Sequence, residues 1–391
     1  MIFTHLYIDN FYNFHDTAID FTLKRELKDS VIEGEYLEDR PKFRFKRVCI
    51  LSGANASGKT SLGHILHHIQ HFILSPNIKL NKINCKEKVG TLRVEFVFPK
   101  TNTIHSLEIV EDSGSKEFPI ITYAQIPILQ NNTAYSSRKR LQLFIEKQGN
   151  SNIEGVFFTN KNDSSQFYTF KDIRSLVSEN LFFYYMFSHN FEKNKIFVDN
   201  LNTDVLEKIL KTFDSSISSV DEIFNKDTVL EGYSIHFSNK DSILIGKNGE
   251  MPNTDRLSKG TFDSIQVAEF VAYIIDISTE GNYNDTCATF FLDEKMAYSH
   301  SELEQAIINL IIQKMGRYSQ FFYTTHNYDV LDMNLPVHSY LFLRKNGDRA
   351  EFVQPENQFS KNDRSLLNYV KNDIFNTVPD ISLLDDLLFE D

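Results

Sequence analysis

Residues Gly53–Thr60 read GANASGKT, and this stretch decides the fold. It follows the apolar run VCIL at residues 48–51 and precedes a segment whose apolar residues recur at helical spacing. It matches the pattern G-x-x-x-x-G-K-[ST] in full. The two glycines let the backbone fold around an anion with its N–H groups turned inward, and the next helix adds the positive end of its dipole. The sequence therefore predicts a strand, a phosphate-binding loop and a helix from Thr60 to about Leu74.

Each residue type in this loop has a chemical reason. Lys59 is expected to reach the β- and γ-phosphates of a nucleoside triphosphate, and the Thr60 hydroxyl to bind Mg²⁺. The motif alone does not separate a kinase, a GTPase and an ATPase. The other residues expected to contact the nucleotide are Gly53, Ala54, Asn55, Ala56, Ser57, Gly58 and Ser61.

A second motif places two carboxylates at the end of an apolar run. Residues Thr289–Glu294 read TFFLDE. In an enzyme with a phosphate-binding loop, Asp293 would hold Mg²⁺ and Glu294 would polarise the attacking water as a general base. The alternative is a buried strand that ends in a polar turn.

Two further motifs have equally plain alternatives. Residues 257–261 read LSKGT directly before a helical segment, so Ser258 and Gly260 could form a second anion site, or Ser258 could simply cap the helix. Residues 321–327 read FFYTTHN, which places His326 after a strand, where it could reach a γ-phosphate or could merely end the strand.

The order of the four motifs resembles one protein class. A phosphate-binding loop, LSxG, an apolar strand ending in DE and a strand ending in TTH occur in this order in ABC-type ATPases. The chain resembles stand-alone members related to the overcoming-lysogenization-defect proteins, to double-strand-break-repair proteins and to SMC heads. The start LYIDNFYNFHDTAIDF (residues 6–21) and the end SLLNYVKNDIFNTVPDI (residues 365–381) add to this likeness.

This resemblance implies a fold and a mechanism. The fold is an α/β ABC head, with a parallel sheet core, an antiparallel β lobe and a mainly helical insertion without a long coiled coil. Two copies would form a head-to-tail dimer with composite ATP sites. Lys59, Thr60, Asp293, Glu294 and His326 would act from one subunit, and Ser258 and Gly260 from the other. ATP would hold the dimer together and hydrolysis would release it.

Two features of that family are not settled by the sequence. The family uses a Gln between the phosphate-binding loop and LSxG, and Gln125, Gln130 and Gln142 are all candidates. The segment 295–305 (KMAYSHSELEQ) departs from the usual acidic-then-His-Pro form of the subunit-contact loop.

Three parts are expected along the chain. Residues 1–130 would form the N-terminal part of the head, residues 131–229 a β and helical insertion that is a candidate partner surface, and residues 230–391 the C-terminal part. Strands are expected within 91–170, including Leu141–Glu146, with polar connections at 131–140 and 160–166. Residues 171–225 are expected to be mainly helical, and 261–344 to alternate helix and strand.

The composition of the chain disfavours several functional classes of protein. The net charge of −12 argues against a broad nucleic-acid surface, although a local patch at Arg40–Arg47 with Arg138–Arg140 stays open. Three cysteines without a CxxC pair indicate neither disulfides nor zinc. No apolar run is long enough to span a membrane, and no leader is recognisable, so a cytoplasmic protein is expected.

Two further patterns match known functional motifs but are interpreted as having no function. NKND at residues 160–163 matches the N-K-x-D motif with which GTPases recognise guanine. A GTPase would also need a D-x-x-G motif between the phosphate-binding loop and this site, and none is present, so a polar turn is preferred. The histidines His64, His67, His68 and His71 repeat along the helix after the phosphate-binding loop and are expected to lie on a solvated face, opposite its apolar side.

Three functions remain open at this stage. The chain resembles the ATPase half of PARIS-type anti-phage pairs, which implies a switch that controls a separate toxic TOPRIM-type effector. A DNA-repair ATPase that clamps DNA and a nucleotide-gated scaffold without turnover are the alternatives.

Overall fold

The computed structural model describes residues 1–24, 30–74, 82–112, 119–160, 181–188, 201–252, 257–279, 287–359 and 366–377. Their contacts divide the chain into two compact units. Unit 1 comprises Met1–Phe183, Cys287–Thr289 and Tyr318–Asp391, and unit 2 comprises Tyr184–Thr286 and Phe290–Arg317.

Unit 1 is built around strand β5 (Val48–Gly53), in which every residue is buried. β5 pairs in parallel with β15 (Gln320–Thr325) on one side and with β16 (Tyr340–Asn346) on the other, and β16 pairs antiparallel with β17 (Arg349–Val353). A strand buried on both faces needs an almost wholly apolar sequence, and VCIL meets that need. The expected parallel core around the phosphate-binding loop is therefore present.

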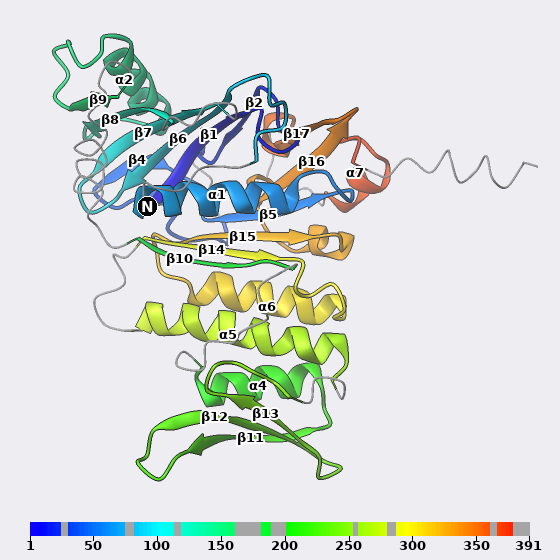
Figure 1. Cartoon of the computed structure of the whole chain (residues 1–391). Coiled ribbons are helices and arrows are strands. Elements are labelled where there is room, and N and C mark those ends of the chain that lie inside the picture. Colours follow the sequence, from blue (N-terminus) through cyan, green and yellow to red (C-terminus); the bar gives the residue numbers. More distant parts are fainter. Residues whose placement is uncertain are drawn as a thin grey trace, which may run out of the picture. The chain divides into compact units, whose positions relative to one another are not determined.

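Helix α1 (Lys59–Leu74) follows β5, as predicted. Its buried residues include Leu62, Ile65, Leu66 and Ile69, which recur at three- and four-residue spacing on one face. In Figure 1, α1 lies between β5 and a second, antiparallel sheet.

This antiparallel sheet has the strand order β2-β1-β6-β7-β8-β9. Residues Leu92, Val94 and Phe96 of β6 alternate with Arg93 and Glu95, so one face is apolar and the other is largely polar, as the alternation predicts. The strands are β1 (Ile2–Asp9), β2 (Thr17–Asp20), β6 (Gly90–Phe98), β7 (Thr103–Glu111), β8 (Ile120–Pro127) and β9 (Val156–Thr159).

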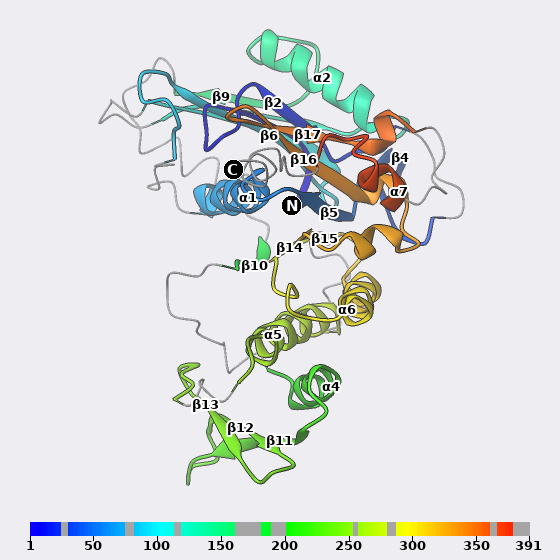
Figure 2. The same ribbon diagram turned by 90° about the vertical axis from the view of Figure 1, so that its right-hand side faces the viewer.

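Helix α2 (Ala134–Glu146) corrects the sequence analysis. Residues Leu141–Glu146 were expected to form a strand and 131–140 a polar connection, but they form one helix. Thr133 caps it, because its hydroxyl accepts a hydrogen bond from the Ser136 N–H at 3.1 Å in a capping box. The helix covers the sheet face opposite to α1 (Figure 2). Its Leu141 and Phe144 join a buried cluster that includes Val97, Ile104, Ala124 and Ile126.

Short elements complete unit 1. A hairpin joins β3 (Tyr36–Leu37) to β4 (Arg40–Arg44). After β15 the chain forms four short helices: η4 (Tyr328–Asp332), η5 (Val337–Ser339), η6 (Pro355–Asn357) and α7 (Leu367–Lys371).

Unit 2 contains a small layered region. Strands β11 (Ile217–Phe224), β12 (Leu230–Phe237) and β13 (Ser242–Gly246) form an antiparallel sheet. Helix α4 (Thr203–Phe213) contacts β11 on one side and α5 (Lys259–Thr279) on the other. Helix α6 (Ser301–Lys314) also contacts α5.

The helical expectation for 171–225 is only partly right. Helix α4 lies in this range, but Phe182–Met186 forms strand β10 and Ile217–Phe224 forms β11. Aromatic side chains favour strands when they pack on a pleated surface, and FFYYM is almost wholly aromatic. Residues 171–180 lie outside the described residues, as does the acidic tail from 380 onward.

Strand β14 (Ala288–Asp293) crosses the boundary between the units. Ala288 and Thr289 group with unit 1, and Phe290–Asp293 group with unit 2. Within unit 1, Gln70 Nε2 of α1 donates a hydrogen bond of 3.0 Å to Thr289 Oγ1. The start of β14 therefore lies against the helix that follows the phosphate-binding loop.

The fold class is mixed α/β, as expected. The longest helix of the described residues is α5 with 21 residues, which agrees with the expected lack of a long coiled coil. None of the helices in the described ranges is long and apolar enough to cross a membrane.

Candidate nucleotide site

The backbone of the phosphate-binding loop depends on its two glycines. Gly53 has φ 155° and Gly58 has φ 108°, values that side chains rarely allow. A Cβ atom at position 53 would lie 2.1 Å from the Leu343 carbonyl oxygen, and one at position 58 would lie 2.9 Å from the Phe14 ring. A larger residue at position 53 would therefore collide with the backbone of β16, and one at position 58 would have to displace the Phe14 ring while adopting a φ that disfavours side chains.

Two side chains of the loop could donate hydrogen bonds to a bound anion. Lys59 is 4% exposed, and its ammonium donates hydrogen bonds to the carbonyl oxygens of Gly53 at 2.9 Å and Ala54 at 3.2 Å. Ser57 is fully buried, and its hydroxyl has no hydrogen-bond partner among the described residues. A bound phosphate would offer the Ser57 hydroxyl an acceptor and would give the Lys59 ammonium an anionic one.

The connection between β1 and β2 supports the loop, a role that the sequence analysis did not assign. Asn13 Nδ2 donates a hydrogen bond of 3.3 Å to the Ala56 carbonyl oxygen. Phe14 packs on Phe352 with ring centroids 5.1 Å apart. Tyr12 stacks on His64 of α1 at 6.4 Å. The signal was the opening stretch LYIDNFYNFHDTAIDF at residues 6–21, which was given only as a likeness.

His326 lies at the same edge of the parallel sheet as the loop. Thr325 of β15 pairs with Ser52 of β5, so His326 follows directly where β5 enters Gly53. Its side chain is exposed. The next residue, Asn327, accepts a hydrogen bond of 3.0 Å from the Asp329 N–H and so fixes the turn into η4. Unit 1 thus brings His326 to the end of the sheet that carries Lys59 and Thr60.

The two carboxylates of the DE motif lie in unit 2 and have unlike surroundings. Asp293 is fully buried and accepts hydrogen bonds from the Ser188 hydroxyl at 2.8 Å and the Ser188 N–H at 3.3 Å. Glu294 is half-buried and has a left-handed backbone, with φ 50°. Such a conformation is costly for a non-glycine residue and is concentrated at functional sites. Ser188 was not identified from the sequence.

Ser258 caps helix α5, which was the simpler of the two interpretations. Its hydroxyl accepts a hydrogen bond from the Thr261 N–H at 3.0 Å, the usual bond of an N-cap. Thr261 Oγ1 in turn donates to Asp214 Oδ2 at 3.3 Å. Capping satisfies only one of the free N–H groups at the helix start, so those of Lys259 and Gly260 are not consumed by it.

The segment after Glu294 is tied to α5 within unit 2. Lys295 is 5% exposed and donates a hydrogen bond of 2.7 Å to Gln266 Oε1. Burial lowers the pKa of Lys295, while the nearby Asp263 opposes that shift. Lys259 donates to the Tyr298 hydroxyl at 2.9 Å and lies 4.1 Å from the centre of its ring. The LSKGT motif and the unusual KMAYSH segment therefore contact each other.

The Gln that the family uses stays unassigned. Gln125 lies on β8 and accepts a hydrogen bond of 3.1 Å from the Tyr123 hydroxyl. Gln142 lies on α2, and Gln130 is exposed in the turn before it. Neither the bond of Gln125 nor the position of Gln142 involves the phosphate-binding loop.

The histidine stripe differs from its prediction. His64, His67, His68 and His71 are all partly buried rather than fully solvated. His67 and His71 pack against each other at 4.3 Å and against Phe183 at 5.9 and 5.3 Å. Burial lowers the pKa of His67 and of His68 to about 4. Among the described residues, no group of three His, Cys, Asp or Glu side chains is arranged to hold a metal ion.

Several cations of the possible basic patch are already paired. Lys46 pairs with Glu356, and Arg138 pairs with Glu95 and Asp20. Arg40 donates to the Ile128 carbonyl oxygen at 2.8 Å. The ion pairs of Lys46 and Arg138 leave less positive charge for nucleic acid than the sequence indicates. Residues 161–163 of the NKND motif lie outside the described residues.

Known proteins resemble this chain in structure. No family model and no curated protein matches the sequence. An Smc head bound to the C-winged helix domain of ScpA is 11% identical over 90% of this chain and 97% of its own, with a TM-score of 0.46. An Smc head of Pyrococcus furiosus with an extended coiled coil is 11% identical over 95% and 99%, with a TM-score of 0.47. The recombination mediator RecF is 10% identical over 90% and 98%, with a TM-score of 0.35. The chain is thus similar over most of its length to SMC heads and RecF.

Proposed function

We propose that this chain is an ABC-type ATPase whose active sites form between two copies arranged head to tail. The observation that carries the proposal is the phosphate-binding loop at the end of the central parallel strand. Its backbone has the glycine conformations that the motif requires, and its buried Ser57 hydroxyl lacks a partner in the described part of the chain.

The other motifs supply the chemistry of hydrolysis. Glu294, half-buried on a left-handed backbone, would orient and deprotonate the attacking water. Lys59 would neutralise charge on the β- and γ-phosphates, and the exposed His326 would contact the γ-phosphate from the end of β15. Ser258 and Gly260, at the start of α5, would close on the nucleotide of the other copy.

The donors present suit magnesium. Thr60 offers a hydroxyl and the fully buried Asp293 a carboxylate, and Mg²⁺ prefers such hard oxygen ligands together with water and phosphate. When bound, the ion would screen the phosphate charges. The Ser188 bonds hold Asp293 in one orientation, which such a role requires.

The test compares the mass in solution of the wild type and Glu294→Gln, by light scattering, with and without ATP and Mg²⁺. We expect Glu294→Gln to accumulate a larger species that depends on ATP, because ATP can bind but is not hydrolysed. Adding Lys59→Ala to this variant should abolish that species. One unchanged mass in every condition, together with equal ATP turnover by Lys59→Ala and the wild type, would refute the proposal.

On the sequence resemblance alone, we further propose that the ATPase controls a separate effector protein, of the TOPRIM nuclease type, in anti-phage defence. Expression from its native operon should yield a complex with a neighbouring gene's product, and a lone oligomer would count against this role. DNA-stimulated hydrolysis that weakens with salt would favour the DNA-clamp alternative. Absence of turnover in the wild type would favour the scaffold.

A further inference from the structure

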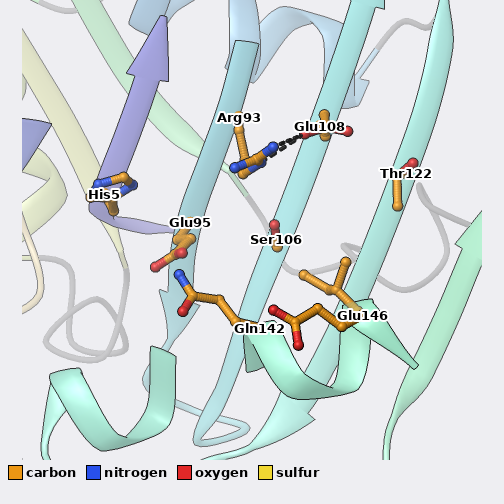
Figure 3. Close-up of a pocket in the computed structure, with 9 residues that line it drawn as sticks. His5, Arg93, Glu95, Ser106, Glu108, Thr122, Gln142 and Glu146 are labelled. Atoms are coloured by element: carbon orange, nitrogen blue, oxygen red, sulfur yellow. Dashed lines mark hydrogen bonds and ion pairs between the residues drawn. The ribbon is translucent and has the colours of Figure 1, made fainter. Parts of the chain in front are cut away.

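Unit 1 contains a polar pocket that the proposed ATPase does not use. It has a volume of about 440 Å³ and lies on the face of the antiparallel sheet that α2 covers in part (Figure 3). Its lining comes from β1, β6, β7, β8 and the C-terminal half of α2: His5, Arg93, Glu95, Ser106, Glu108, Thr122, Gln142, Ile145 and Glu146.

The floor follows from the strand register. His5 pairs with Glu95 and Glu95 with Ser106, which forms one row across three strands. Arg93 pairs with Glu108 and Glu108 with Thr122, which forms the next row. Residues two apart on a strand share a face, so both rows point to the same side.

Helix α2 forms one wall. Gln142 and Glu146 are four residues apart and therefore lie one above the other on the helix. Both are exposed, so the pocket opens at this end of α2. Figure 3 shows both side chains on the helix beside Glu95 and Ser106.

The pocket carries an excess of negative charge. Among its lining residues, Arg93 contributes one positive charge and Glu95, Glu108 and Glu146 contribute three negative charges. Burial, aided by the charge of Arg138, lowers the pKa of His5 to about 4, so His5 is neutral at neutral pH. Arg93 pairs with Glu108, and Arg138 pairs with Glu95 from the side.

Two polar groups at the floor make no hydrogen bond to a described residue, and one of them, His5 Nδ1, is also closed to solvent. Ser106 is 3% exposed, and no hydrogen bond of its hydroxyl to any described residue is present. His5 Nδ1 is buried and likewise lacks a hydrogen bond there. A buried polar atom such as His5 Nδ1 normally has a partner, and both residues line a space large enough for a small molecule.

We propose that this pocket binds an aliphatic ammonium or guanidinium group. The carboxylate of Glu146 at the mouth attracts the cation, and the Ser106 hydroxyl at the floor accepts one of its N–H groups. An anion is disfavoured because Arg93 and Arg138 pair with Glu108 and Glu95, and the charge of Glu146 leaves the pocket with a net negative charge. The group comes either from a free amine or from a Lys or Arg side chain that a partner protein inserts.

Calorimetric titration of the whole protein at low salt separates these cases. The small probes are putrescine and agmatine, with 1,4-butanediol as the uncharged match of putrescine. The second arm uses a short arginine-containing peptide and the same peptide with arginine replaced by glutamine. We expect one saturable site for the cations and none for the diol.

Matched variants place the site. Glu146→Gln should weaken binding about tenfold, the usual effect of losing one charge-assisted hydrogen bond. Ser106→Ala removes a hydroxyl without partners, so it should fold normally, as its thermal midpoint will report, and bind several-fold more weakly. The control Glu154→Gln removes the same charge from an exposed residue outside the lining and should bind as the wild type does.

Three outcomes decide the proposal. Binding of the small amines that Glu146→Gln and Ser106→Ala weaken assigns the pocket to a free amine. Binding of the arginine peptide alone, with the same response to the variants, assigns it to a partner's side chain. The proposal is wrong if neither probe binds, or if Glu154→Gln weakens binding as much as Glu146→Gln.

Discussion

Arg138 joins three parts of unit 1, and its replacement by Met tests how they are held. From α2 its guanidinium donates to Glu95 on β6 at 2.5 Å, to Asp20 at 3.0 Å and to the Thr4 carbonyl oxygen at 3.2 Å. The Glu95 side chain is only 4% exposed. Met fills a similar volume but leaves the Glu95 carboxylate buried without its cation.

The loss of unfolding free energy can be estimated from the cost of protonating Glu95. Burial already raises the pKa of Glu95 above its usual 4.5, and Arg138 opposes this rise. Without Arg138, the folded protein avoids a buried charge by protonating Glu95. At about 1.4 kcal/mol per pH unit, this costs about 3.5 kcal/mol at pH 7 and under about 1 kcal/mol at pH 5. We therefore expect a loss of about 3 kcal/mol at pH 7, within the range for a broken buried ion pair.

The sign of the pH dependence is fixed. In the variant, the folded pKa of Glu95 lies above its unfolded value, so stability falls as pH rises from 5 to 7. Burial alone would raise the pKa of Asp20, but the charge and hydrogen bonds of Arg138 lower it below its usual 3.8 in the wild type. In the variant these effects of Arg138 are lost, so burial of Asp20 is opposed only by its hydrogen bonds from Thr22, and any rise in the pKa of Asp20 acts in the same direction as that of Glu95.

Urea unfolding at pH 5, 6 and 7 measures the effect. The stability of Arg138→Met with Glu95→Gln should vary less with pH than that of Arg138→Met alone, because the deeply buried carboxylate is removed and only the more exposed Asp20 remains. Lys139→Met, at the exposed neighbouring position, should change stability by under about 0.5 kcal/mol. A loss below 1 kcal/mol at pH 7, or an equal loss at pH 5 and pH 7, would refute this account.

Three further predictions concern the nucleotide site. ATP with Mg²⁺ at 100 times its dissociation constant should stabilise the wild type by about 2.7 kcal/mol in thermal unfolding and Lys59→Ala by almost nothing; equal stabilisation would exclude Lys59 from binding. Ser258→Ala should lower the free energy of unfolding by about 1 kcal/mol and Ser258→Asp by much less, because Asp also caps helices. Both variants should lose ATP-dependent association; normal association of Ser258→Asp would show that Ser258 acts only as a helix cap. Gly53→Ala should lose several kcal/mol of unfolding free energy and should not bind ATP, because its Cβ would meet the Leu343 carbonyl oxygen. Gly347→Ala, with φ 64° and no atom within 4 Å of the new Cβ, should lose about 1 kcal/mol, and equal losses in the two variants would contradict the role of the Leu343 contact.

The phosphate-binding loop and its surroundings could be predicted because their determinants are local. The run VCIL, the two glycines and the apolar spacing of α1 lie within 27 residues of one another and specify one strand, one turn and one helix. The support from Asn13 and Phe14 could not be derived in the same way. It depends on a β1–β2 connection that packs on the loop from more than 40 positions earlier in the chain.

Strand β10 was misassigned because its partners are distant. The run FFYYM has no period that separates a short buried strand from a helix. In unit 2, Tyr184 Oη donates to Glu269 of α5, and the Tyr184 ring packs on Phe270. These contacts join residues more than 80 positions apart, so the local sequence pattern could not predict either of them.

The polar pocket shows how one wrong element can hide a site. The alternation in β6 correctly placed Arg93 and Glu95 on a polar face, and a polar face without cover is simply solvated. When Leu141–Glu146 is taken as a strand, nothing covers this face. As part of α2, Leu141 and Phe144 pack on the apolar end of the same face, and this packing holds Gln142 and Glu146 over its polar end. The helix thereby turns two rows of solvated side chains into a floor on which Ser106 is 3% exposed. The charge of Glu146 matters for a ligand only because α2 is helical, so a helix-breaking change such as Ser137→Pro should abolish amine binding even though it alters no lining residue.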